Sequence, residues 1–186
     1  MSQEGRGGVA VAARSYEEVL AKARGRAEEA LRAAGVSFSV EEGKGFVDLV
    51  VGVDDVVRAA EVLKAAGFTN VVSVTAVDYP KAKKIKVAYH ATSMLDEEIM
   101  GAIVGLAVYL PRADSPSMPS LTQVWPSAEF MEREVYEFFG VVFEGHPNLK
   151  PLLLIPQLAE KRPLRKDFIV REESIYEGVP ERVRRG

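Results

Sequence analysis

The sequence contains no cysteine. Without thiolates the chain has no disulfide framework, no Cys-x-x-Cys redox pair and no means of holding an iron–sulfur cluster by itself. Histidine is almost as scarce, with only His90 and His146, so a histidine-rich metal centre is excluded too. A carboxylate site for a hard cation stays open. These shortages lead us to expect no metal and no cofactor on this chain.

Long apolar runs and strong net charge are also missing. The longest apolar run covers residues 99–110, well short of the roughly 20 residues that a transmembrane helix needs. A net charge of −3 is too small to predict binding to nucleic acid or to an anionic membrane. The N-terminus lacks the basic start and apolar core of a signal peptide. We therefore expect a cytoplasmic protein that reaches a membrane only through partners.

The sequence does contain enough apolar material for one globular core, because 47% of its 186 residues are hydrophobic. Apolar spacing and turn residues predict these elements: a helix over residues 16–34, a hairpin over 36–51, a helix over 55–66, and strands over 68–77, 84–91 and 99–110. The last stretch is also compatible with a helix, but the alternation from Val104 to Leu110 favours a buried strand.

Residues 68–77 are rich in Val and Thr, so we expect a central strand there. In the next strand Lys84 and Lys86 alternate with apolar residues, which is typical of a solvated sheet edge. The order α-β-β-α-β-β-β, followed by a helix and an extended C-terminal tail, predicts an α+β fold. We expect a two-layer sandwich in which helices cover one mixed β-sheet.

The two ends of the chain differ from its middle. Residues 1–13 are rich in Gly and Ala without a period, and we interpret them as a flexible N-terminal arm. Residues 14–148 form the predicted α+β core domain. In residues 149–186 proline recurs too often for a long helix or a central strand, yet apolar residues are frequent. Such a segment needs another surface to lie on, so we predict an extended, partner-binding C-terminal tail.

The densest cluster of charged and aromatic side chains lies between residues 132 and 150. We predict a helix here that is capped by Ser127 and ends at Gly140, which can adopt the left-handed conformation. Its spacing gives one apolar half and one polar half. Arg133 and Glu137 stand four residues apart on the polar half and can pair, and Glu132 lies on the same half.

Glu134 does not fit this division, because it falls between Phe130 and Phe138 in the apolar half. A carboxylate in a dry setting needs a cation or several hydrogen-bond donors. We therefore predict that Glu134 is shielded from water and paired with a cation from the tail or from a partner. Arg165 is the candidate within this chain.

The same stretch resembles a known family. Its motif is the run Glu132-Arg133-Glu134 followed, at fixed spacings, by Glu137, His146 and Lys150. A second match is the run from Pro163 to Phe168. Together these patterns resemble the thirty-kilodalton subunit family of respiratory complex I, the NADH:quinone oxidoreductase. They are also similar to the related subunit of membrane-bound NiFe hydrogenases.

The resemblance implies a noncatalytic peripheral-arm subunit of a membrane-bound, ion-translocating oxidoreductase. Its role would be structural, in assembly, beside the subunits that carry the quinone site and the iron–sulfur clusters. The implied partners are the protein of the same complex that resembles a hydrogenase large subunit and the small cluster-bearing protein next to it. Iron–sulfur clusters, with NADH and quinone or with a NiFe centre, would belong to the parent complex, on the inner face of the cell membrane.

The resemblance also implies which residues matter. None is expected to be catalytic, to bind a cofactor or to bind a metal. The motif positions are instead carried over as partner-interface residues: Glu132, Arg133, Glu134, Glu137, His146, Lys150, Pro163, Leu164, Arg165, Lys166, Asp167 and Phe168.

Two alternatives stay open. The chain departs from the complex I pattern at Tyr136, Phe138 and residues 157–161, so it could be the equivalent subunit of a membrane-bound NiFe hydrogenase or formate hydrogenlyase complex. The other alternative is a free-standing small hydrolase that uses Glu144 and His146. Against it, a histidine in a tight loop before proline more commonly bonds to nearby backbone.

Overall fold

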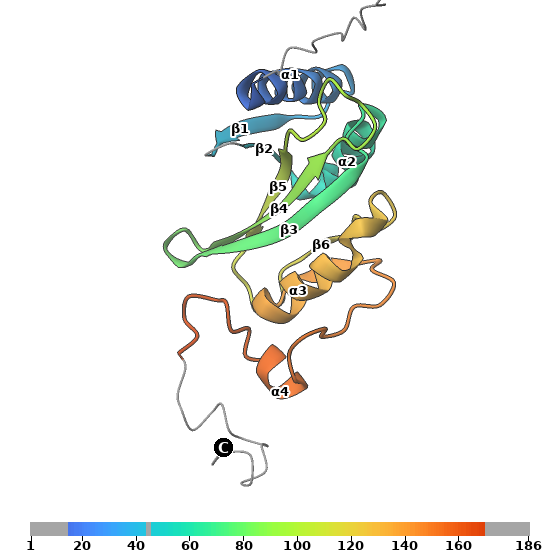
Figure 1. The fold of residues 1–186 in the computed structure, drawn as a ribbon. Helices are drawn as coiled ribbons and strands as arrows, with labels where there is room; N and C mark the ends of the chain where they lie inside the picture. Colours follow the sequence, from blue (N-terminus) through green and yellow to red (C-terminus); the bar gives the residue numbers. More distant parts are fainter. Residues whose placement is uncertain (1–14, 44–45, 170–186) are drawn as a thin grey trace, which may run out of the picture.

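The computed structural model describes residues 15–43 and 46–169 (Figure 1). The predicted N-terminal arm, residues 1–13, lies outside the described residues, as does the end of the predicted tail, residues 170–186. The predicted core domain and the first part of the predicted tail, up to residue 169, can therefore be compared with the structure.

Two helices pack on one face of the sheet. The first, α1 (Tyr16–Ala33), begins with a reciprocal capping box between Ser15 and Glu18 and buries a narrow stripe that includes Ala23 and Ala27. The second, α2 (Val56–Ala65), buries Ala59, Ala60 and Leu63. Small residues on both helices allow close approach, and α1 and α2 contact each other and β5 (Figure 1). Both predicted helices are confirmed.

The sheet has five strands in the order β1-β2-β5-β4-β3. The strands are β1 (Phe38–Glu42), β2 (Val47–Val51), β3 (Asn70–Tyr79), β4 (Lys84–Thr92) and β5 (Val104–Pro111). Only β2 and β5 pair in parallel, and the other neighbours are antiparallel. The predicted α+β fold with one mixed sheet is confirmed, and the ambiguous stretch 99–110 contains a buried strand.

The position of two strands within the sheet differs from the prediction. The strand predicted to be central, β3, lies at the edge, and β4 lies between β3 and β5. Lys86 is therefore buried, with its Nζ 2.7 Å from Asp48 Oδ2 and 2.6 Å from Glu41 Oε2. Lys84 is exposed. Alternation along a strand shows which side chains share a face, but it carries no information about which strand lies next to it.

The helix that contains the motif, α3 (Glu129–Phe139), packs against β3 and lies between the sheet and a short helix, α4 (Pro156–Ala159) (Figure 1). Gly140 ends α3 at φ +72°, as predicted. The predicted cap is wrong: the N-cap residue of α3 is Ala128, and no side chain caps the helix there. The Ser127 hydroxyl instead accepts from the N–H of Val71 and donates to its C=O, in the edge strand β3.

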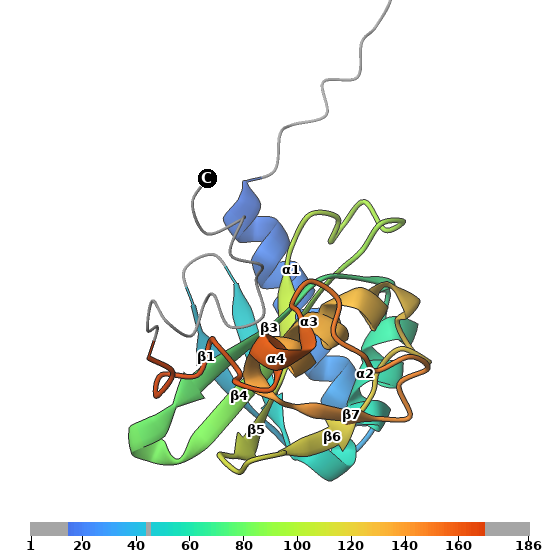
Figure 2. The same ribbon diagram turned by 90° about the horizontal axis from the view of Figure 1, so that it is seen from below.

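The remaining elements flank α3 or cross it. A short parallel pair, β6 (Ser117–Pro119) and β7 (Val142–Glu144), flanks the helix. The chain from residue 149 to 169, called the C-terminal segment below, then crosses α3 with α4 as its single helical turn (Figure 2). A long helix and a central strand are absent from this described segment, as its prolines predict.

Candidate functional site

The charged side chains of α3 do not follow the predicted apolar and polar halves. Glu132 and Glu137, predicted on the polar half, are fully buried, while Glu134 is only half-buried. The reason is that α3 is covered on two sides, by the sheet and by the C-terminal segment. Its polar half therefore faces protein rather than solvent.

Glu132 joins α3 to the sheet. Its Oε1 accepts hydrogen bonds from the Tyr89 hydroxyl on β4 and from the Leu121 amide, each at 2.8 Å. Its Oε2 accepts from the Ser120 hydroxyl at 2.6 Å. Burial raises the pKa of the Glu132 carboxyl, against the pull of these three donors. A helix carboxylate inside the core is thereby satisfied by neutral donors.

Arg133 and Glu137 hold the C-terminal segment by its backbone. Arg133 donates to the carbonyls of Lys150 and Pro151, at 2.9 and 3.1 Å. The Glu137 carboxylate accepts the consecutive amides of residues 152, 153 and 154, at 2.8, 3.1 and 3.0 Å to Oε2. The predicted ion pair between Arg133 and Glu137 is therefore wrong. The positive Arg133 side chain binds carbonyl oxygens of the segment, and the negative Glu137 side chain binds its amide N–H groups.

His146 has both ring nitrogens occupied. Its Nε2 donates to the Glu129 carbonyl at 2.9 Å, and its Nδ1 accepts from the Asn148 amide at 3.0 Å. This arrangement defines a neutral ring with its proton on Nε2. Glu144 is exposed, and within the described residues no hydrogen bond or ion pair joins its carboxylate to His146. The geometry thus gives the hydrolase alternative no base–acid pair.

Arg165 is buried and binds backbone carbonyls. It donates to Phe139 at 2.7 Å, to Ala113 at 2.9 Å and to Asp114 at 3.3 Å. A cation at the last carbonyls of α3 is favourable, because the C-terminal end of a helix carries partial negative charge. The predicted pair between Arg165 and Glu134 is wrong, since these carbonyls occupy the guanidinium.

Asp78, at the end of β3, binds the second motif. Arg112 donates to both of its carboxylate oxygens, at 2.7 and 3.0 Å, and the Lys166 amide donates to Oδ2 at 2.9 Å. Arg112 also pairs with Asp167 at 2.8 Å. The Arg112 guanidinium holds the pKa of the Asp78 carboxyl below its ordinary range. This cluster joins β3, the loop after β5 and the C-terminal segment.

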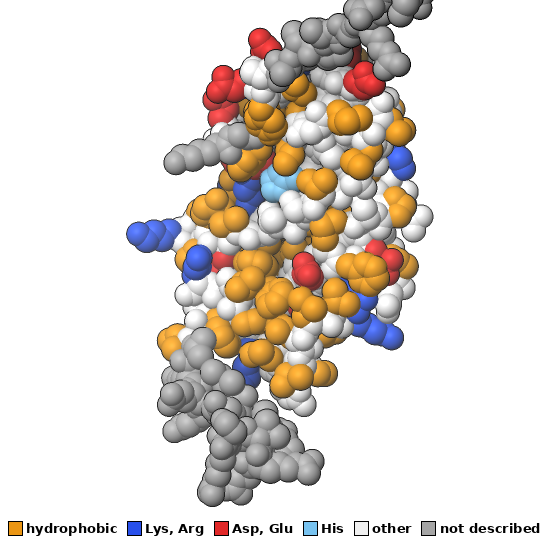
Figure 3. Space-filling view, in the orientation of Figure 1, with side chains coloured by type: hydrophobic (Ala, Val, Ile, Leu, Met, Phe, Trp, Pro, Cys, Tyr) orange, Lys and Arg blue, Asp and Glu red, His pale blue; other side chains and the backbone are white. Residues whose placement is uncertain are grey.

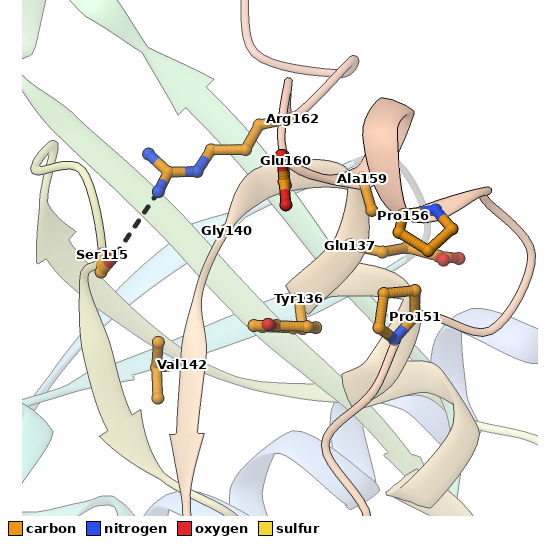
Figure 4. A pocket seen from close by; sticks show the side chains of 10 residues that line it. All are labelled: Ser115, Tyr136, Glu137, Gly140, Val142, Pro151, Pro156, Ala159, Glu160 and Arg162. Atoms are coloured by element: carbon orange, nitrogen blue, oxygen red, sulfur yellow. Dashed lines mark hydrogen bonds between the residues drawn. The ribbon is translucent and has the colours of Figure 1, made fainter. Parts of the chain in front are cut away.

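A cavity of about 440 Å³ lies between α3 and the C-terminal segment (Figure 4). Tyr136 and two prolines, Pro151 and Pro156, line its apolar part, and Arg162 reaches over Gly140 toward Ser115 at 3.4 Å. A Cβ at Gly140 would lie 2.3 Å from the Arg162 Nε. The Glu137 carboxylate in its lining already accepts three backbone amides.

The other motif residues lie nearer the surface. Lys150, Leu164, Lys166 and Asp167 are exposed, whereas Pro163 and Phe168 are half-buried. Sequence reasoning missed Tyr89, Ser120 and Asp78 as site residues. Arg112 was missed as well, because it follows a strand end without a motif. Within the described residues, no three His, Asp or Glu side chains come together as a metal site.

The fold and this site define an α+β protein whose motif charges hold its own C-terminal segment against the core. The profile of the family described as "Respiratory-chain NADH dehydrogenase, 30 Kd subunit" matches residues 49–174. That range is more than half of the chain, so the chain belongs to this family.

Two relatives illustrate the spread of the family. The matching subunit of the F(420)H(2) dehydrogenase of Methanosarcina mazei is 35% identical over 162 residues, which cover 87% of this chain and 91% of that protein. The NADH-quinone oxidoreductase subunit 5 of Thermus thermophilus is 40% identical over 111 residues, 56% of this chain and 53% of that protein. The chain thus matches about half the length of the Thermus relative.

A solved structure shares the fold. A chain of the membrane-bound sulfane sulfur reductase, an archaeal respiratory membrane complex, superposes with a TM-score of 0.70 at 25% identity, covering 85% of this chain and 91% of that one. Among the described helices of the present chain, none is both long enough and apolar enough to cross a bilayer. The predicted resemblance to the thirty-kilodalton subunit family is confirmed.

Proposed function

We propose that this protein is a noncatalytic peripheral-arm subunit of a membrane-bound, ion-translocating oxidoreductase of the complex I class, with a structural and assembly role. The observation that carries the proposal is how the C-terminal segment is held. Arg133 and Glu137 bind only its backbone carbonyls and amides, so its side chains stay available. The backbone of the segment is thereby fixed, while its side chains can contact another protein.

The surface that these side chains form is apolar. Leu153 is 65% exposed, Ile155 54% and Leu164 52%. Side chains of this kind on a segment fixed by its own backbone favour a protein interface, because ordering the segment in advance lowers the entropic cost of binding. We propose that residues 149–186 act as the partner-binding part of the chain and residues 14–148 as its core. Buried motif residues such as Glu132, Glu137 and Arg165 position the surface rather than contact the partner.

The proposed partners are two proteins of the same complex, one that resembles a hydrogenase large subunit and one that is small and bears an iron–sulfur cluster, at the cytoplasmic face of the membrane. Their chemistry would supply the clusters and the quinone site. The family members named above belong to complexes with different substrates, NADH and quinone in one and F(420)H(2) in another. The likeness to a sulfane sulfur reductase chain favours, as a second candidate, a respiratory membrane complex other than an NADH:quinone oxidoreductase.

The test is purification of the complex through a tag on this chain. We expect cluster-bearing subunits to copurify with the wild-type chain. The double variant Leu153→Asp/Ile155→Asp should recover at least about tenfold less partner, because burying its two aspartates at the interface costs more than about 1.4 kcal/mol in total. Leu95→Asp, on an exposed side chain of a distant loop, is the control and should leave recovery unchanged. A wild-type chain recovered without redox subunits would contradict the proposal.

A further inference from the structure

A second surface of the molecule lies between the edge strand β3 and helix α3. Val74, Thr75 and Ala76 of β3 line one side of this groove, and Phe138, Leu164 and Glu134 line the other. Its volume is about 310 Å³. Figure 3 shows hydrophobic side chains gathered over β3 and α3, with an acidic side chain among them. We call this feature the β3–α3 groove.

Glu134 has no partner for its charge in the part of the chain that the structure describes. Within the described residues it forms no hydrogen bond and no ion pair, although it is half-buried. The nearby motif cations are engaged elsewhere, Arg133 with the carbonyls of residues 150 and 151 and Arg165 with carbonyls at the end of α3. Glu132 and Glu137 on the same helix are satisfied by three donors each. Among the motif acids of α3, Glu134 alone is therefore unpaired within the described residues, and it lies in an apolar groove.

The strand that borders the groove is also incomplete. β3 pairs with β4 on one side only, and Ser127 bonds to its backbone at Val71. Val72 and Val77 of β3 are 46% and 41% exposed. An edge strand with exposed apolar residues is usually covered, because its free backbone groups and side chains would otherwise recruit other chains. Leu164 belongs both to the groove and to the apolar surface proposed above, so the two surfaces are continuous.

We infer that the β3–α3 groove receives an extended apolar segment of a neighbouring subunit, and that this segment places a lysine or arginine against Glu134. The Glu134 charge favours a basic residue at one position of the segment, and the apolar walls of the groove favour apolar residues on either side of it. This inference rests on the proposed function, since it names the chemistry of one partner contact. It adds a second contact, on the opposite side of α3 from the cavity at Tyr136.

The test is photo-cross-linking in the purified complex. Thr75→p-benzoylphenylalanine places a photoreactive group in the groove, and Leu95→p-benzoylphenylalanine is the control outside it. We expect the position-75 adduct to join a neighbouring subunit at a peptide that contains lysine or arginine between apolar residues. An adduct with residues 170–186 of this chain, an adduct with a second copy, or no adduct above the control would each overturn the inference.

Charge variants give a second, independent readout. Glu134→Gln keeps the shape of the side chain. Glu61→Gln, on the exposed face of α2, is the matched control. We expect recovery of partner by the wild type to fall with salt, and we expect Glu134→Gln to recover several-fold less partner and to lose this salt dependence. Its unfolding in isolation should match the wild type, because the charge has no partner within the described chain. If Glu134→Gln and Glu61→Gln copurify with the complex equally well, the groove inference fails while the proposed function stands.

Discussion

Three carboxylates on one helix have three different environments in this protein. Glu132 is buried against hydroxyls and one amide, Glu137 is buried against three backbone amides, and Glu134 faces a groove without a partner among the described residues. They are separated by only two or three residues along the chain. Their roles therefore follow from what each one faces, and substitutions at the three positions should have different consequences.

Glu132 should make stability depend on pH. Burial raises its folded-state pKa, so the folded protein binds more protons than the unfolded chain between the ordinary Glu pKa of about 4.3 and the raised value. The free energy of unfolding should therefore fall as pH rises through that window. Each pH unit between the two pKa values corresponds to about 1.4 kcal/mol.

The measurement for Glu132 is urea unfolding of the wild type and Glu132→Gln between pH 4 and pH 8. The glutamine variant cannot ionise, and it should lack this part of the pH dependence. Glu61→Gln, on the exposed face of α2, should retain the wild-type profile. Parallel curves for the wild type and Glu132→Gln would contradict the prediction.

Glu137 should control the order of the C-terminal segment. Glu137→Ala leaves the amides of residues 152, 153 and 154 without their acceptor, at a cost of about 1–3 kcal/mol for each group that stays buried. We expect these amides to exchange with deuterium much faster, while amides in β4 keep their protection. Glu144→Ala removes an exposed carboxylate and should change neither. Unchanged exchange at residues 152–154 in Glu137→Ala would show that the carboxylate does not hold the segment.

At the scale of elements, Gly140 both ends helix α3 and leaves room for a side chain of the C-terminal segment. Gly140 adopts φ +72°, which favours glycine, and its missing Cβ leaves room for the Arg162 side chain. The turn that stops the helix and the return of the C-terminal segment thus meet at the same residue.

Gly140→Ala should therefore destabilise the protein more than an alanine at another left-handed helix end. Gly35 follows α1 at φ +69° and has nothing within 4 Å of an added Cβ. Gly35→Ala should show only the backbone cost of about 1 kcal/mol, whereas Gly140→Ala adds the displacement of Arg162. Chemical denaturation of the two variants gives the difference directly. Equal losses would mean that Arg162 moves aside freely.

Two strands show where element-level reasoning succeeds and where it stops. The apolar alternation of residues 84–91 and 104–110 predicted strands, and both are present, as β4 and β5. The predicted positions of β3 and β4 within the sheet were wrong, and so was the predicted solvent exposure of Lys86. Lys86 on β4 needs Asp48 from β2 and Glu41 from β1, and no local pattern brings these three together.

At the scale of the whole molecule, the Asp78 cluster joins parts of the chain that lie far apart in sequence. Arg112 bridges Asp78 and Asp167, and both carboxyl pKa values are lowered by its charge. A lowered folded-state pKa contributes stability above the ordinary Asp pKa of about 3.9, and that stability is lost as pH falls through the folded-state value. Acid should therefore release the C-terminal segment from β3.

Asp78→Asn should weaken this acid dependence. We expect a smaller fall in the free energy of unfolding between pH 6 and pH 2 than in the wild type, together with lower stability at neutral pH. Urea unfolding across that range measures both. Asp54→Asn, at a site before α2, is the control and should keep the wild-type slope. A wild-type slope in Asp78→Asn would assign the acid sensitivity to other carboxyls.

The sequence by itself determined the α+β class, most of the elements, the family and the motif positions, because periodicity, turn residues and spacing are local properties of the chain. Only the tertiary structure decided what the motif residues contact. The prediction divided α3 into a buried half and a solvated half, but α3 lies between the sheet and the C-terminal segment, so both halves meet protein. Burial depends on what lies opposite a side chain, and for Glu132, Glu137 and Arg165 those partners come from other parts of the chain.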